Sequence, residues 1–181
     1  EFQSVRMGFA AQRSDLFTDP NSSAAEALYW VQNNGNTYTE VQNVGIPPIA
    51  LTYYGTRFDT FEYSLGWSYD SRNRALFADR GSRHRLSASY ALPFSDIDFV
   101  SFNYDYLQFI PVSKWFTLMF NSEAGYGQAL GDTTSMPPYR RFFAGGPETV
   151  RGYRESRMGP KDSFGNPYGG NIKFTNQFEL L

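Results

Sequence analysis

The stretch that decides the fold of this chain is FEYSLGWSYD, residues 61–70. Apolar and aromatic side chains occupy every odd position, and small, hydroxylated or acidic residues occupy the even ones. Strict period two is typical of a β-strand whose two faces meet different environments. The stretch therefore predicts a strand with one apolar face and one polar face.

The same alternation recurs in five other segments, so the sequence predicts six strands. Their expected ranges are 2–13, 57–70, 84–93, 98–110, 115–127 and 171–181. In these alternating runs the apolar positions carry no charge, whereas the opposite positions carry both acidic and basic side chains. The connections 14–56 and 128–170 are long loops, and an antiparallel meander would place both on the same side.

These strands fit a membrane-spanning β-barrel better than the alternative, a soluble β-sandwich. They run for roughly 9–12 residues, as a tilted strand that crosses a bilayer must, whereas sandwich strands are usually shorter. Aromatic residues make up 18% of a chain whose mean hydropathy is only -0.48. Tyr69, Tyr106 and Tyr126 fall near predicted strand ends, where an aromatic girdle would meet the membrane surface.

Composition argues against several other classes of protein. The 181 residues include no cysteine and one histidine, and the formal net charge is -2 without a basic run. A disulfide scaffold, a metal site and nucleic-acid binding are therefore not expected, nor is any cofactor. The single histidine, His84, lies between two arginines in a predicted turn, and we expect it to be exposed or interfacial rather than catalytic. No catalytic residue is predicted.

The first long loop contains one helix signal, and the strand count indicates a larger assembly. Ser23-Ala24-Ala25-Glu26 forms a capping box, and the helix that follows is expected to end near Gly35. Its Tyr29 and Trp30 are expected to lie at the barrel rim or lipid interface, or to pack on their own loop. Six strands cannot enclose a lumen, because about eight already give an interior filled by side chains. We therefore expect this chain to be one piece of a barrel.

The second long loop carries the most specific motif. Residues 139–153 read YRRFFAGGPETVRGY, followed by MGPK at 158–161 and GGN at 169–171. In this loop, and in the segment RALFADRGSR at 74–83, the chain resembles the BamA superfamily of outer-membrane barrels. One departure is Ala78, where many members have proline. The resemblance covers essentially the whole chain.

This resemblance implies an integral outer-membrane barrel of about sixteen strands that folds and inserts other β-barrel proteins. The implied partners are unfolded client barrels, outer-membrane lipids and accessory lipoproteins, the last through periplasmic domains that we expect to lie outside these residues. The alternative within the superfamily is a two-partner secretion transporter. A passive porin or an outer-membrane enzyme is a further alternative outside it.

The resemblance and the residue chemistry together predict how the loop is held. The expected functional motif comprises Gly145, Gly146, Val150, Arg151, Gly152 and Tyr153. The glycines permit a sharp fold back into the lumen, and Arg151 is the expected anchor on the inner wall. The candidate lumenal carboxylates are Glu62, Asp105, Glu123 and Glu179, although the family pattern implies that the acidic partners of Arg151 lie mostly after residue 181. The alternative is a flexible loop tip with a solvated Arg151.

Overall fold

A computed structural model describes residues 2–19 and 24–181, which form one antiparallel sheet of seven strands. The strands pair in the order β1–β3–β4–β5–β6–β7, and β2 pairs with β3 beside this path. Their bounds are β1 Phe2–Thr18, β2 Asn36–Val44, β3 Ile49–Asp70, β4 Gly81–Ala91, β5 Phe99–Pro111, β6 Thr117–Ala129 and β7 Ile172–Leu180. The predicted all-β antiparallel architecture is confirmed.

The strand register separates two chemically different faces. Trp67 pairs with Leu86, and Leu86 pairs in turn with Tyr104 on the next strand. One residue further along β4 and β5, Arg85 pairs with Asp105. Directly paired residues share a face and successive residues alternate, so the apolar positions gather on one face and the charged positions on the other. We call these the outer face and the lumenal face.

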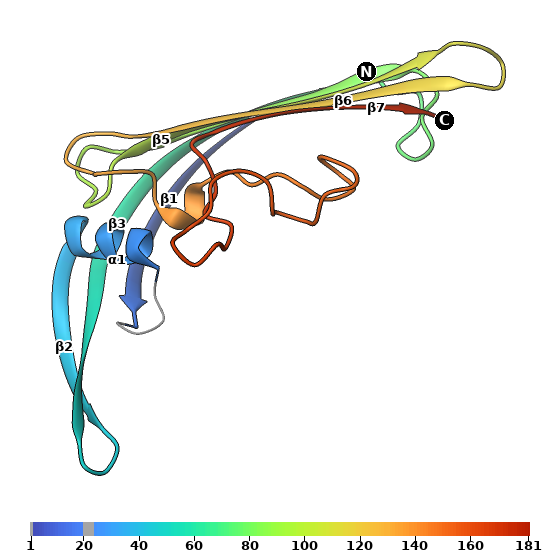
Figure 1. Ribbon diagram of the computed structural model, residues 1–181. Helices are drawn as coiled ribbons and strands as arrows, with labels where there is room; N and C mark the ends of the chain where they lie inside the picture. The colour runs from blue at the N-terminus through green and yellow to red at the C-terminus, as the bar shows by residue number, and fades with distance from the viewer. Residues whose placement is uncertain (1, 20–23) are drawn as a thin grey trace.

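The lumenal face is the one that the rest of the chain covers. Figure 1 shows a curved sheet with helix α1, Ala25–Asn33, and the segment between β6 and β7 on its concave side. Trp30 of α1 packs edge-on against Phe58, which lies in the same alternate phase of β3 as Glu62. Among the described residues, no helix is long and apolar enough to cross a membrane.

The structure differs from the prediction within 14–56, where a loop was expected. There β1 continues to Thr18, and β2 forms a hairpin with the first part of β3, which begins at Ile49. Strand β2 carries mostly polar residues on both of its faces, so apolar periodicity does not reveal the hairpin. The ring of Tyr38 lies over Gly55 on the paired strand, at a position where a Cβ would clash with it. An aromatic side chain that covers a strand glycine in this way helps to fix register.

The predicted helix is present, but its aromatic residues are placed differently from expectation. The predicted N-cap, Ser23, lies outside the described residues, and the helix ends at Asn33, with Asn34 as its C-cap and Gly35 next at φ of 67°. Trp30 is fully buried against the lumenal face instead of lying at the rim, at the lipid interface or on its own loop, whereas Tyr29 is exposed. The helix sits on β3 because Phe58 and Trp30 offer each other apolar surface.

Charged and aromatic side chains bound the apolar band of the outer face. At the end near the two long loops, Arg13 pairs with Asp59 at 2.6 Å, and Arg57 pairs with Asp15 at 2.9 Å. At the opposite end lie Tyr69 and His84, paired in register. His84, which the prediction placed at the junction of a turn and the strand 84–93, lies inside β4, because the alternation of β4 begins earlier than its apolar residues suggest.

The two faces of β4 predict opposite responses to an introduced charge. In the full-length protein, Ala88→Lys should slow membrane insertion and lower stability by about 2–4 kcal/mol, because a lysine near mid-bilayer would face lipid. Ser87→Lys, one residue away on the lumenal face, should have little effect. Urea unfolding of both variants in bilayers measures the difference, and equal destabilisation would contradict the assignment of the faces.

Candidate functional site

The candidate site is the segment 130–171 between β6 and β7, which we call the lumenal loop. It is ordered by its own backbone bridges, which join Phe142 to Gly170, Ala144 to Met158, Gly146 to Val150, and Lys161 to Pro167. A short 3₁₀ helix, η1 Pro138–Arg140, begins with a proline whose fixed φ suits a helical first turn. The loop therefore enters the lumen as a folded unit with a defined shape.

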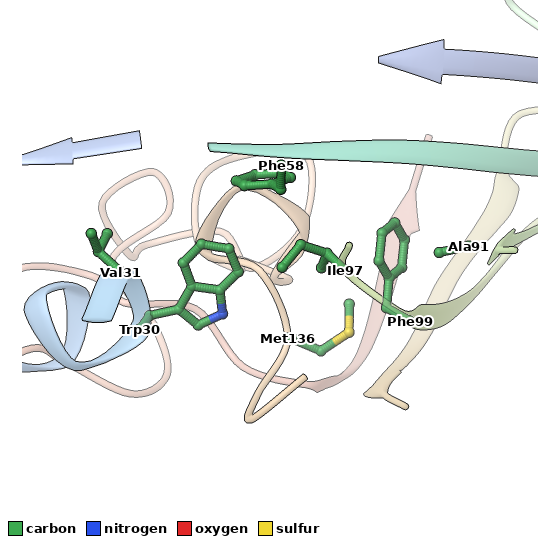
Figure 2. Close-up of a cluster of buried hydrophobic side chains, with 7 residues drawn as sticks. All are labelled: Trp30, Val31, Phe58, Ala91, Ile97, Phe99 and Met136. Atoms are coloured by element: carbon green, nitrogen blue, oxygen red, sulfur yellow. The ribbon is translucent and has the colours of Figure 1, made fainter. Parts of the chain in front are cut away.

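An apolar cluster holds the first part of the lumenal loop. We call it the mouth core, and Figure 2 shows its members: Trp30, Val31, Phe58, Ala91, Ile97, Phe99 and Met136. Met136 comes from the lumenal loop, Trp30 and Val31 from α1, and the others from the wall and its connections. The mouth core thus joins both long loops to the lumenal face.

Hydrogen bonds reinforce the same junction. The indole Nε1 of Trp30 donates to the carbonyl of Ser135 at 3.0 Å. The Asn34 amide donates to the Thr134 hydroxyl at 2.7 Å and accepts from the Thr134 backbone N–H at 2.8 Å. Near the start of α1, the Glu26 carboxylate accepts a hydrogen bond from the backbone N–H of Ser163 in the lumenal loop at 3.0 Å. This hydrogen bond lowers the pKa of Glu26, since it favours the charged form.

Two buried glycines of β6 let the loop approach the wall closely. A Cβ at Gly125 would lie 2.9 Å from the ring of Phe142, and one at Gly127 would lie 2.7 Å from the terminal methyl of Met136. The Phe142 ring therefore lies directly on the strand backbone. Any larger residue at Gly125 would push the loop away from the lumenal face.

The best-buried ionic contact of the loop is made by Arg140, which the sequence reasoning did not single out. Its guanidinium pairs with the Glu62 carboxylate of β3 and lies 5.3 Å from the Phe99 ring centroid. Its neighbour Arg141 stacks over Tyr168 at 3.7 Å and donates to the carbonyl of Met136 at 3.1 Å. The Pro137-Pro138 pair before them was the available signal, because it fixes the turn that presents both arginines.

The glycine motif forms a tight turn at the loop tip. Gly145 has φ of 114°, and a Cβ there would lie 2.4 Å from the Arg154 carbonyl oxygen, so only glycine fits. The Gly145 N–H donates to the Thr149 hydroxyl at 2.9 Å, and the Val150 N–H donates to the Gly146 carbonyl at 2.9 Å. The motif residues Gly152 and Tyr153 are exposed.

Arg151 reaches the wall within this chain. Its Nη1 lies 3.3 Å from Oε1 of Glu179 on β7, although 76% of its side chain remains exposed. A partner for Arg151 is thus present before residue 181, where the family pattern implied that most would come later. The tip also accepts hydrogen bonds from wall side chains: Asn121 donates to the Glu148 carbonyl at 3.4 Å and Gln177 donates to the Pro147 carbonyl at 3.3 Å.

The four predicted carboxylates share the lumenal face but have different partners. Glu62 and Glu179 meet loop arginines, whereas Glu123 pairs with Lys173 on the neighbouring strand. Asp105 lies opposite both Arg85 and Glu123 in register and forms no ion pair among the described residues. In the same part of the chain, no cluster of three or more His, Cys, Asp or Glu side chains could hold a metal ion. The ion pairs of Glu62 and Glu179 with loop arginines therefore support docking of the loop on the lumenal face.

An apolar outer face, a charged lumenal face and a loop folded back onto that face define the wall of an outer-membrane β-barrel. The family model described as the Omp85 superfamily domain matches residues 3–181. This chain therefore belongs to the Omp85 superfamily and is part of an integral outer-membrane protein.

Two relatives show where the similarity lies. Over 125 residues, the chain is 36% identical to the outer membrane protein assembly factor BamA of Neisseria meningitidis serogroup B, covering 67% of this chain and 16% of the relative. A crystal structure of BamA from Haemophilus ducreyi lacking POTRA domains 1-3 matches with a TM-score of 0.79 at 22% identity, over 98% of this chain and 34% of that chain. The chain thus spans a minor part of the length of both.

The close contact at Gly125 gives a test of the loop's position. Gly125→Val in the full-length protein should displace Phe142 and lower stability by about 1–3 kcal/mol, the usual cost of overpacking. The matched control is Gly66→Val, because Gly66 lies on the lumenal face of β3 with no atom closer than 3.9 Å to its added Cβ. Limited proteolysis should cut the lumenal loop faster in the first variant only. Equal cleavage would show that the loop does not rest on β6.

Arg140 and Arg151 are expected to contribute unequally to the stability of the lumenal loop. Arg140→Ala should destabilise the loop by about 1–3 kcal/mol, because it leaves the half-buried Glu62 carboxylate without its charged donor. Arg151→Ala should cost less than about 1 kcal/mol, as expected for an exposed pair. Hydrogen exchange of the loop amides shows which of the two variants destabilises the loop more. The reverse order would make Arg151 the principal anchor.

Proposed function

We propose that the protein containing this chain folds and inserts other β-barrel proteins into the outer membrane. The observation that carries the proposal is the docked lumenal loop, held by the mouth core at one end and by Arg140 and Glu62 below it. A lumen occupied by an ordered loop favours a function in which clients interact with the strands of the barrel wall. Membership of the Omp85 superfamily and the similarity to an assembly factor support the same function.

Insertion of a client requires no bond chemistry in this proposal. An unfolded client strand pairs by β-augmentation with an edge strand of the opened barrel, and the backbone hydrogen bonds of that pairing supply the affinity. The wall described here stays rigid and keeps the lumen closed while the edge opens. The proposed partners are unfolded client barrels and outer-membrane lipids, with accessory lipoproteins bound through periplasmic domains.

The alternative function is that of a two-partner secretion transporter, which exports a polypeptide through the lumen. Passage would require the mouth core to open, because Trp30 and Met136 are fully buried there and join α1 to the lumenal loop. Passive diffusion through a porin would also require the mouth core to open. The continuous packing of both long loops at this mouth favours the assembly function.

A reversible cross-link across the mouth separates the two functions. These residues contain no native cysteine, and Glu26 contacts Ser163 between α1 and the lumenal loop. Glu26→Cys with Ser163→Cys, joined by a short reducible linker in the full-length protein, should leave client insertion into proteoliposomes unchanged. The same sample after reduction is the control.

Two outcomes would overturn the proposal. Insertion that stops on cross-linking and returns on reduction would indicate passage through the lumen. Wild-type proteoliposomes that insert client barrels no faster than empty liposomes would rule out the assembly function directly.

A further inference from the structure

An aromatic cluster surrounds the single histidine on the outer face. His84 of β4 lies in register between Tyr69 of β3 and Tyr106 of β5, with ring centroids 5.8 Å and 4.7 Å away. The rings of Trp67 and Tyr104 lie 6.2 Å from the imidazole. All five side chains occupy the outer face. The cluster therefore places the polar imidazole of His84 toward lipid.

The depth of His84 matches the surface of the bilayer. Tyr69 is the penultimate residue of β3, and His84 is the fourth residue of β4. At about 3.3 Å per residue, His84 stands roughly 10 Å along the strand from the turn 71–80. Aromatic side chains with a polar end concentrate at this level of membrane barrels, where hydrocarbon meets headgroups.

The cluster has polar atoms that its own residues do not satisfy. Nδ1 of His84 lies 2.9 Å from the Tyr104 hydroxyl, and the Tyr106 hydroxyl donates to Gln108 at 2.9 Å. Within the described ranges 2–19 and 24–181, neither Nε2 of His84 nor the Tyr69 hydroxyl has a hydrogen-bond partner. At the membrane interface such groups take their hydrogen-bond partners from water or lipid headgroups, so both atoms are open to an external acceptor.

The adjoining turns carry unpaired positive charge. Arg74 and Arg80 lie in the turn 71–80, and Lys114 lies in the turn 112–116; none of the three forms an ion pair within the described part of the chain. Both turns line one depression, but its strand residues Pro111, Thr117 and Leu181 belong to the lumenal phase, so it opens beside the lumenal face and does not include His84. Phe77 and Trp115 are 93% and 86% exposed. Arg80 and Lys114 therefore lie at the same end of the sheet as the aromatic cluster but beside the other face, where they add only long-range attraction for an anionic headgroup layer.

We propose that His84 and Tyr69 bind the phosphodiester group of a phospholipid in the leaflet next to the turns 71–80 and 112–116. The imidazole and the phenol hydroxyl donate to the phosphate oxygens, and the surrounding rings contact the glycerol and the upper acyl chains. Arg80 and Lys114 supply the longer-range attraction. The site does not depend on the assembly activity, since it uses only the outer face.

Native mass spectrometry of the full-length protein with added phosphatidylglycerol tests the site. His84→Phe keeps an aromatic ring but removes both ring nitrogens, and Tyr69→Phe removes one hydroxyl. We expect His84→Phe to weaken retention of one bound lipid roughly tenfold, the effect of losing a hydrogen bond to a charged group. Tyr126→Phe is the matched control, because Tyr126 lies toward the opposite end of the outer face and its hydroxyl donates to Gln128 at 2.7 Å.

The comparison separates a defined site from a general aromatic girdle. Heat-modified gel mobility first establishes that each variant is folded. Retention that is unchanged in His84→Phe, or that falls equally in Tyr126→Phe, would overturn the proposal. Displacement of the retained lipid by inorganic phosphate alone would also overturn it, because it would identify a free anion site instead of a lipid site.

Discussion

Within the apolar band, the antiparallel register of β3, β4 and β5 keeps charged side chains on the lumenal face, and the rest of the molecule depends on this. A slip of one residue would turn Glu62, Arg85 and Asp105 toward lipid. An arginine facing lipid costs about 2–4 kcal/mol at mid-bilayer, and the cost is smaller for a carboxylate or nearer the membrane surface, whereas a single backbone hydrogen bond contributes about 1 kcal/mol net. The membrane therefore adds to the backbone hydrogen bonds in fixing the register, and the lumenal loop docks on a face whose chemistry the register has set.

The lumenal loop is held by two kinds of contact that act at different depths. At the mouth, Trp30 and Met136 are removed from water, and burial of each such side chain contributes about 1.5–3 kcal/mol. Deeper in the lumen the contacts are ionic, and an exposed pair such as Arg151 with Glu179 contributes less than about 1 kcal/mol. Apolar packing and the contact of Arg140 with Glu62 therefore supply most of the energy that holds the loop, while Arg151 fixes the orientation of its tip.

The sequence predicted the strands wherever the two faces differ in polarity, because period two is then visible residue by residue. It did not reveal β2, whose residues are polar on both faces. This strand pairs with the first part of β3, beyond the end of the apolar band that lies near the long loops. The lumenal carboxylates followed from strand phase, but their partners did not, since Arg140 lies 78 residues from Glu62 and meets it only through the turn that Pro137 and Pro138 set. The burial of Trp30 was missed for the same reason: its contacts come from Phe58 and from the carbonyl of Ser135, far along the chain.

The ion pair of Arg13 with Asp59 and the cluster around His84 lie at opposite ends of the apolar band. About ten residues of β3 separate Asp59 from Tyr69, which corresponds to about 33 Å along the strand. With a tilt of about 40°, this spans about 25 Å of membrane thickness, the usual height of the apolar band on such barrels. The covalent length of one strand thus sets the local thickness of the bilayer. A bilayer of longer-chain lipids would have to become thinner beside this wall, because a thicker hydrocarbon layer would enclose the charged side chains at the edge of the apolar band.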